Sequence, residues 1–242
     1  MEKKRVQDGS LVLDGLPDTG LVGTIAALHL VRAKGMSPMV RIDSDLLPPV
    51  AIVKEMNLFE PLMIYSSDGV SVIASEIPIP TEITKPFARE LVVWIKDHRC
   101  RAVISIGGIP EPARSEIEEP EVFYLTNSTE AFSATIDLGK TKQLDSAFLV
   151  GPKAAFLLEC FREEIPTIGL FAQSFPNYPD PGAAASALTL LRRSDVFQVD
   201  LEELVKSGEE MRVRFRDLMR RTMGEMERAQ KSREMESPSL LV

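Results

Sequence analysis

Hydrophobic and polar residues follow one another along the chain in blocks that predict short buried strands and amphipathic helices. Residues 11–13 form an apolar run that is too short for a helix and has the length of a buried parallel strand. Glycine and proline then mark a tight loop at residues 15–20. From there apolar residues recur every three or four positions up to Val31, which is the helical period. Strand, turn and helix together predict the start of a βαβ unit.

Similar blocks recur further along the chain. The most apolar runs, residues 101–106 and 166–172, predict two more buried strands. Two apolar runs that flank Asp68 and Gly69 predict a β-hairpin, because Asp-Gly is a strong turn signal. Helices are predicted at residues 84–98, 151–162 and 183–191. This alternation predicts an α/β fold with a mainly parallel sheet and helices on both of its faces.

The C-terminal part of the sequence predicts one long helix and a short tail. From Leu201 onward, apolar residues recur at spacings of three and four, as in a coiled coil. The candidate seam between subunits consists of Leu204, Met211, Phe215 and Leu218. The alternative is a helix that lies on its own domain, but the many charges beyond Phe215 favour a helix that contacts another subunit or protrudes. We therefore expect an α/β domain at residues 1–198, the helix at 199–236 and a flexible tail at 237–242.

Charge and cysteine content narrow the range of partners. The 242 residues carry a formal net charge of −8, which argues against a nucleic-acid backbone as the main ligand. Cys100 and Cys160 are far apart and lack metal-ligand spacing, so we expect reduced thiols, no metal and no cofactor. The sequence has neither an N-terminal apolar signal region nor a run of 18 apolar residues. These features predict a cytoplasmic protein that does not bind membranes.

The loops that follow parallel strands meet at one edge of a sheet and form the usual ligand crevice. Here they carry eight candidate crevice residues: Asp18, Gly20, Gly23, Glu76, Gly107, Gly108, Asn127 and Asp180. Asp18 and Glu76 could act together as general acid and base. The glycine-rich loop could hold a phosphate, but its spacing fits neither the dinucleotide nor the P-loop motif. A structural loop, in which Gly23 allows close packing of helix on sheet, is therefore favoured.

Other catalytic signatures are missing from the sequence. There is no G-x-S-x-G nucleophile elbow. His29 falls within a helical pattern and His98 at the end of one, so neither is expected to be a general base or a metal ligand. The sequence thus predicts a crevice without an evident catalytic residue, which leaves enzymatic activity uncertain and favours its absence.

Six stretches of the sequence, taken in order, carry a family resemblance. They are GLPDTGLVGTIAALHLV (15–31), SEIPIPTE (75–82), ISIGGIP (104–110), LVGPKAAFLL (149–158), IPTIGLFAQ (165–173) and PDPGAAASAL (179–188). The set resembles the proteasome assembly chaperone family, in its second-chaperone branch with archaeal and actinobacterial members. The resemblance implies a three-layer αβα fold similar to the phosphorylase/hydrolase type, with no established catalysis. It also implies a homo-oligomer that binds proteasome subunits as a chaperone.

The end of the chain departs from this resemblance at one position. Family members that act on the proteasome often end in a hydrophobic–tyrosine–any tail, which docks between α-ring subunits. This chain ends in Leu240, Leu241 and Val242, so a leucine stands where the tyrosine would be. The leading hypothesis is a non-enzymatic assembly chaperone or scaffold that uses this tail to bind partners. The alternative is a small-molecule hydrolase, or a nucleoside-processing or nucleoside-binding protein, that uses the crevice.

Overall fold

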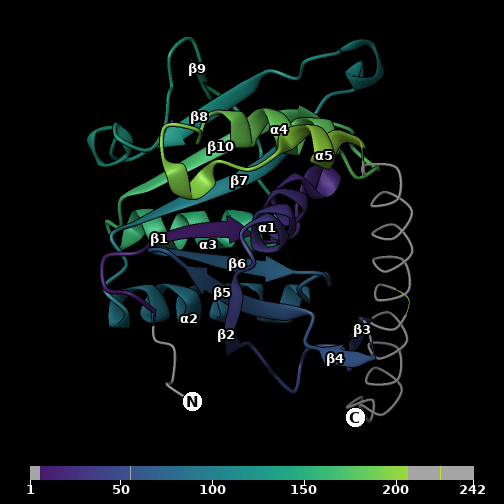
Figure 1. The fold of residues 1–242 in the computed structure, drawn as a ribbon, viewed down its shortest axis with the longest axis vertical. Helices are drawn as coiled ribbons and strands as arrows, with labels where there is room; N and C mark the ends of the chain where they lie inside the picture. The colour runs from purple at the N-terminus through teal and green to yellow at the C-terminus, as the bar shows by residue number, and fades with distance from the viewer. Residues whose placement is uncertain (1–5, 55, 207–223, 225–242) are drawn as a thin grey trace, which may run out of the picture.

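A computed structural model of the protein, which describes residues 6–54, 56–206 and 224, contains a mixed sheet of eight strands (Figure 1). Across the sheet the strands are β2 (Ser37–Arg41), β5 (Leu62–Ser67), β6 (Val70–Ser75), β1 (Leu11–Gly15), β7 (Ala102–Pro110), β10 (Thr167–Ser174), β8 (Val122–Thr126) and β9 (Lys142–Gln143). The central strands β6, β1, β7 and β10 are parallel to one another. Strands β5 and β8 run antiparallel to their central neighbours. The predicted α/β fold with a mainly parallel sheet is confirmed.

Helices cover both faces of the sheet, which gives three layers (Figure 1). On one face lie α1 (Val22–Ala33), α4 (Pro181–Thr189) and α5 (Leu201–Lys206), and on the other lie α2 (Thr84–Asp97) and α3 (Gly151–Arg162). Successive side chains of a strand point to opposite faces. Leu11 and Leu13 of β1 accordingly join the core beneath α1 and α4, whereas Val12 joins the core beneath α2 and α3.

Smaller elements connect these layers. The hairpin β5–β6 turns at Asp68 and Gly69, whose φ angles of 46° and 75° are both positive, as the predicted Asp-Gly turn requires. Strands β3 (Ile52–Lys54) and β4 (Asn57–Phe59) form a separate two-stranded sheet. The 3₁₀ helices are η1 (Thr19–Leu21), η2 (Thr81–Ile83), η3 (Arg114–Glu116), η4 (Glu130–Phe132) and η5 (Asp195–Phe197).

The direction of β8 differs from what a purely parallel sheet would require. Residues 111–121 connect β7 to β8 without an α-helix that could cross over the sheet. A strand parallel to β7 would need such a crossover, because the chain must first return to the opposite edge. Strand β8 therefore starts at the edge where β7 ends and runs back, antiparallel to β10. Asn127, which follows β8, lies at the opposite edge from the crevice, so its assignment to the crevice was wrong.

Helix α5, where the predicted C-terminal helix would begin, packs against the α/β domain. Leu204 of α5 is fully buried in the core that α1 and α4 cover, so it does not belong to a free seam between subunits. Nε2 of His29 donates a hydrogen bond to the carbonyl oxygen of Asp200 at 2.8 Å, and burial lowers the pKa of His29. Arg32, in the last turn of α1, also contacts α5: it forms an ion pair with Glu203 at 3.2 Å. The helix therefore begins as part of this domain.

The other seam residues, Met211, Phe215 and Leu218, lie outside the described residues, as does the tail from 237 to 242. The predicted domain limits at 198 and 236 stay predictions. In the described part of the chain, no helix is long and apolar enough to cross a membrane.

Glycine residues bring α1 into direct contact with the central strands. A Cβ atom on Gly23 would lie 2.3 Å from the carbonyl oxygen of Ile106 in β7, and a Cβ on Gly15 would lie 2.2 Å from the Cβ of Ala27. Both distances are far below van der Waals contact. Only glycine fits at these positions, which is the close helix–sheet packing expected for Gly23. The first turn of α1 therefore rests on the ends of β1 and β7.

Candidate functional site

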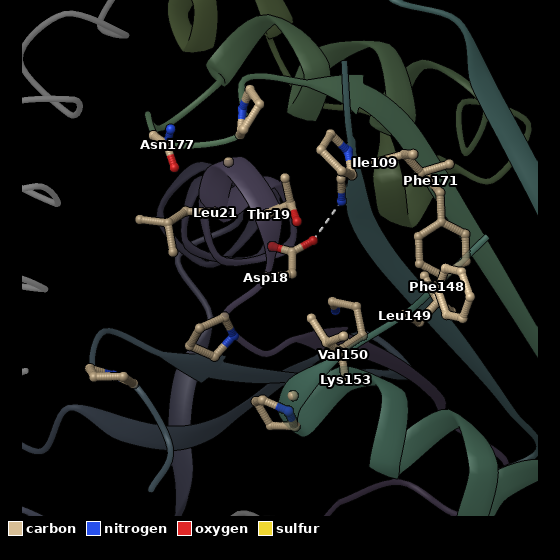
Figure 2. A pocket seen from close by; sticks show the side chains of 18 of the residues that line it. Asp18, Thr19, Leu21, Ile109, Phe148, Leu149, Val150, Lys153, Phe171 and Asn177 are labelled. Carbon is tan, nitrogen blue, oxygen red and sulfur yellow. Dashed lines mark hydrogen bonds between the residues drawn. The ribbon is translucent and has the colours of Figure 1, made fainter. Parts of the chain in front are cut away.

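A crevice of about 1040 Å³ opens at the carboxyl edge of the central parallel strands (Figure 2). The loops that follow β1, β6 and β10 and the last residues of β7 all contribute to its lining, at the edge where the sequence predicted a crevice. One wall, residues 146–153 at the start of α3, was not predicted from the sequence. Gly224 also lines the crevice.

The walls and rim of the crevice are largely apolar. Ile79, Ile109 and Phe171 line it together with several prolines. On the rim the side chains of Phe148, Val150 and Tyr178 are 99%, 76% and 52% exposed. A cluster of exposed apolar side chains around a hollow is typical of a surface that binds another molecule.

Asp18 lies in the floor of the crevice, in the loop after β1 (Figure 2). Its Oδ2 accepts a hydrogen bond from the Gly108 amide at 2.6 Å, and its Oδ1 accepts one from the Gly23 amide at 3.2 Å. Burial raises the pKa of Asp18 to about 7, although the Lys153 ammonium and the two amides lower it and Asp14 raises it slightly. Near neutral pH the carboxyl group is therefore present in both protonation states.

A buried ion pair lies beneath Asp18. Nζ of Lys153 is 2.9 Å from Oδ2 of Asp14, and both side chains are almost fully buried. Asp14 also accepts hydrogen bonds from the Ser105 hydroxyl at 2.7 Å and from the Leu16 amide at 2.8 Å. The pair ties the central strand β1 to the first turn of α3.

The sequence analysis named neither member of this pair, although a signal was present. Asp14 interrupts an apolar strand, and Lys153 stands in an apolar stretch at a predicted helix start. Aspartate and lysine are almost never fully buried unless they are paired. Two isolated charges in two buried segments thus indicate a buried pair, but only the fold shows that these two meet.

The glycine-rich loop has a structural role, and the hydrogen bonds of Asp18 hold it in place. The Gly23 amide, in the first turn of α1, already donates to Asp18, so the chain's own carboxylate occupies the position that an anion would take. Gly20 has φ of 64°, and a Cβ there would lie 1.8 Å from Oγ of Ser174. A Cβ on Gly108 would lie 2.3 Å from the Thr19 carbonyl oxygen, and one on Gly107 2.8 Å from Asp18 Oδ2. These glycines allow the loop to touch the ends of β7 and β10.

Glu76 does not face Asp18. It is buried at the end of β6, and its amide donates to the carbonyl oxygen of Pro61 at 2.8 Å. It is absent from the residues that line the crevice in the described part of the chain. Burial raises the pKa of Tyr65 in β5, and the nearby charge of Glu76 raises it further. The Glu76 carboxylate therefore lies near β5. The structure does not bring Asp18 and Glu76 together as the acid–base pair that the sequence suggested.

The remaining two polar candidates have structural contacts. Asn127 accepts from the Thr167 amide at 2.8 Å and donates to the Ile165 carbonyl oxygen at 2.9 Å, at the start of β10. Asp180 binds Arg114 through two hydrogen bonds of 2.8 and 3.1 Å and caps α4 by accepting from the Ala183 amide. Both Asp180 and Arg114 are buried. Asp180 therefore holds the loop that borders the crevice instead of presenting a charge to it.

The described residues offer no evident nucleophile or metal site. Burial raises the pKa of the Cys160 thiol to about 12 and also raises the pKa of Cys100. Such thiols stay protonated and unreactive at neutral pH. Within the described ranges, no group of three or more His, Cys, Asp or Glu side chains could hold a metal ion.

The buried pair generates a prediction about stability. Lys153→Met leaves the Asp14 carboxylate buried without its counter-charge, so we expect a loss of about 3–5 kcal/mol in the free energy of unfolding, measured with urea. The double variant Asp14→Asn/Lys153→Met removes both charges and should recover most of that loss. Lys206→Met, in the exposed pair with Glu202, is the matched control and should leave stability unchanged. Equal losses in the single and double variants would show that the pair's charges are not coupled.

Asp18 generates a prediction about pH. Because its pKa rises from 3.8 to about 7 on folding, between these values the folded protein holds a proton that the unfolded chain has released. The contribution of Asp18 to stability therefore falls as pH rises from 4 to 7, and is constant above pH 7. Carbon-13 NMR of the aspartate carboxyl groups should show one midpoint near 7 that disappears in Asp18→Asn. A midpoint near 4 for Asp18 would contradict the prediction.

Comparison with known proteins agrees with this fold. The crystal structure of Pyrococcus furiosus PbaA, an archaeal homolog of proteasome-assembly chaperone, is 26% identical and superposes with a TM-score of 0.79 over 94% of this chain and 97% of PbaA. P. furiosus PbaB, an archaeal proteasome activator, is 18% identical and has the same fold, with a TM-score of 0.70 over 89% of this chain and 95% of PbaB.

Sequence comparison extends the likeness over most of the chain. The protein MJ0106 of Methanocaldococcus jannaschii is 23% identical over 96% of this chain and 94% of its own length. Residues 12–219 match the PAC2 family. This range begins within β1 and extends beyond α5, so it spans the sheet and the helices on both of its faces. The chain belongs to the PAC2 family.

Proposed function

We propose that this protein is a non-enzymatic assembly chaperone that associates with itself and binds proteasome α subunits in the cytoplasm. The observation that carries the proposal is the likeness to PbaA, at 26% identity over nearly the whole of both chains. The crevice supports it, because its rim exposes Phe148, Val150 and Tyr178. Aromatic and aliphatic side chains on a surface contribute most to the binding energy when a partner protein buries them.

The internal contacts of the polar groups favour a chaperone over the small-molecule alternative. A hydrolase or nucleoside-binding protein needs amides or charged groups that are free to contact the substrate. Here the Gly23 amide donates to Asp18, and Lys153 is paired with Asp14. Glu76 lies away from the crevice. The Gly23 amide and the Lys153 ammonium thus hold the protein's own structure together instead of contacting a substrate.

Self-association is expected to depend on the C-terminal region beyond α5. Since Leu204 is buried in its own domain, only Met211, Phe215 and Leu218 of the proposed seam remain for contact between subunits. Truncation after Lys206 keeps the packing of α5 and removes these three residues. We expect a smaller assembly in light scattering with multi-angle detection, and a truncated domain that still unfolds cooperatively in urea. An unchanged mass would place the subunit contact elsewhere.

The tail provides a direct test of proteasome binding. Short tails bind by combining apolar side chains with a terminal carboxylate. Deletion of Leu240, Leu241 and Val242 should abolish binding to purified α-subunit rings in surface plasmon resonance. Leu241→Tyr should strengthen binding about fivefold, which corresponds to one additional hydrogen bond of about 1 kcal/mol.

Replacement of the last three residues by serines is the control for tail length, and it should behave like the deletion. Ring binding that survives both changes would show that the tail is not the docking element. No binding of the unaltered protein to α rings would overturn the proposed partner.

A further inference from the structure

The crevice carries one charge that the described residues do not balance. Among the described residues that line it, only Asp18 and Lys153 are charged. Lys153 is already neutralised by Asp14, which is completely buried at 2.9 Å from it. When Asp18 is ionised, its carboxylate is therefore the uncompensated charge in an apolar hollow. A carboxylate in such surroundings is stabilised by a cation that brings its own hydrogen bond.

We propose that the crevice binds a lysine side chain from a partner protein, whose ammonium group meets Asp18 while neighbouring apolar residues of the partner cover the rim. This inference rests on the proposed function only in that the ligand is a protein. It does not require that the partner is a proteasome subunit. The charge of Asp18 is complementary to the ammonium, and the walls are complementary to the rest of the side chain.

The walls of the crevice suit the lysine stem. Lysine buries its four methylene groups along apolar surface while its charged end stays at a polar group. Ile109, Leu149 and Val150 line the crevice with accessible apolar side chains and provide that surface. In Figure 2 the Asp18 side chain lies near the centre of the view, with Thr19 and Leu21, which lead into α1, on one side and residues 148–150 on the other.

The hydrogen bonds of Asp18 favour lysine over arginine. Oδ2 already accepts from the Gly108 amide and Oδ1 from the Gly23 amide, at 2.6 and 3.2 Å. A guanidinium group binds best when its planar fork meets both carboxylate oxygens at once. An ammonium group is a compact donor that needs only one remaining lone pair. Each oxygen keeps one lone pair, and an ammonium group needs only one of the two, whereas a guanidinium fork needs both in the right orientation.

The rim specifies what surrounds the lysine. Phe148, Val150 and Tyr178 stand around the opening and are exposed to solvent. Leucine or a similar residue on either side of the partner's lysine would bury these side chains. The preferred ligand is thus an apolar segment with one lysine at its centre, and not a basic segment.

Capped peptides can test the inference with the full-length protein. The probe is a short acetylated and amidated peptide with one lysine between two leucines, and the matched control carries norleucine, which has a similar stem without the ammonium. By isothermal titration calorimetry at pH 8, we expect the lysine peptide to bind about tenfold more tightly, which is the effect of one charge-assisted hydrogen bond. An arginine peptide should bind more weakly than the lysine peptide.

Variants separate the floor of the crevice from its rim. Asp18→Asn should remove the difference between the lysine and norleucine peptides. Phe148→Ser, at a fully exposed position, should weaken both peptides by the same factor and leave their ratio unchanged. Val93→Ser, on the exposed side of α2, is the control that should change neither.

A pH series tests the same point without a variant, in case Asp18→Asn does not fold. Among the described residues, the charged groups that act on Asp18 are Lys153 from α3 and Asp14 from β1, in addition to the amides from α1 and β7. Because the pKa of Asp18 is about 7, the ratio of the two affinities should rise between pH 6 and pH 8. A constant ratio would contradict the inference.

Several outcomes would overturn the inference. Equal affinities of the lysine and norleucine peptides at pH 8 would show that the crevice binds apolar residues without using Asp18. If a norleucine peptide with a free N-terminal amine binds as tightly as the lysine peptide, the cation that the crevice binds is a chain N terminus and not a lysine side chain. If the peptides do not bind but the tail still mediates ring binding, only the proposed lysine ligand of the crevice is rejected. Peptide binding without ring binding would reject only the proposed proteasome partner.

Discussion

The ion pair between Asp14 and Lys153 connects the central strand of the sheet to α3 and determines the charge of the crevice above it. Because both groups are buried, neither can lose its partner without leaving an uncompensated charge in the core. The pair also lowers the pKa of Asp18 through the ammonium and raises it slightly through the carboxylate. The position of α3, the crevice wall that leads into α3 and the ionisation of Asp18 therefore depend on one contact.

Close contacts at glycine residues complete this arrangement. Gly23 and Gly108 bring the first turn of α1 and the loop before it onto β7, within reach of Asp18. A site that binds phosphate at a helix start keeps its amides free for the ligand. In this protein Asp18 takes that place, so a loop that resembles an anion site in sequence forms part of the floor of an apolar crevice. The Gly23 amide is thus not left free for an anion.

The sequence by itself determined the local elements and their general arrangement. The periods of two and 3.6 residues, together with the Asp-Gly turn, depend on neighbouring residues, and they correctly indicated the central strands, the β5–β6 hairpin and α1 to α4. The loops after the parallel strands also formed the crevice edge that was expected. Of the eight candidate crevice residues, Asp18, Gly20 and Gly108 line it.

The tertiary structure alone decided which distant residues meet. The direction of β8 follows from a connection without a crossover helix, and it moved Asn127 to the other edge. The pairs of Asp14 with Lys153 and of Asp180 with Arg114 join residues that are 139 and 66 positions apart, so no local pattern relates them. Likewise, periodicity shows that Leu204 lies on an apolar helix face, but whether that face meets its own domain or another subunit depends on packing at long range.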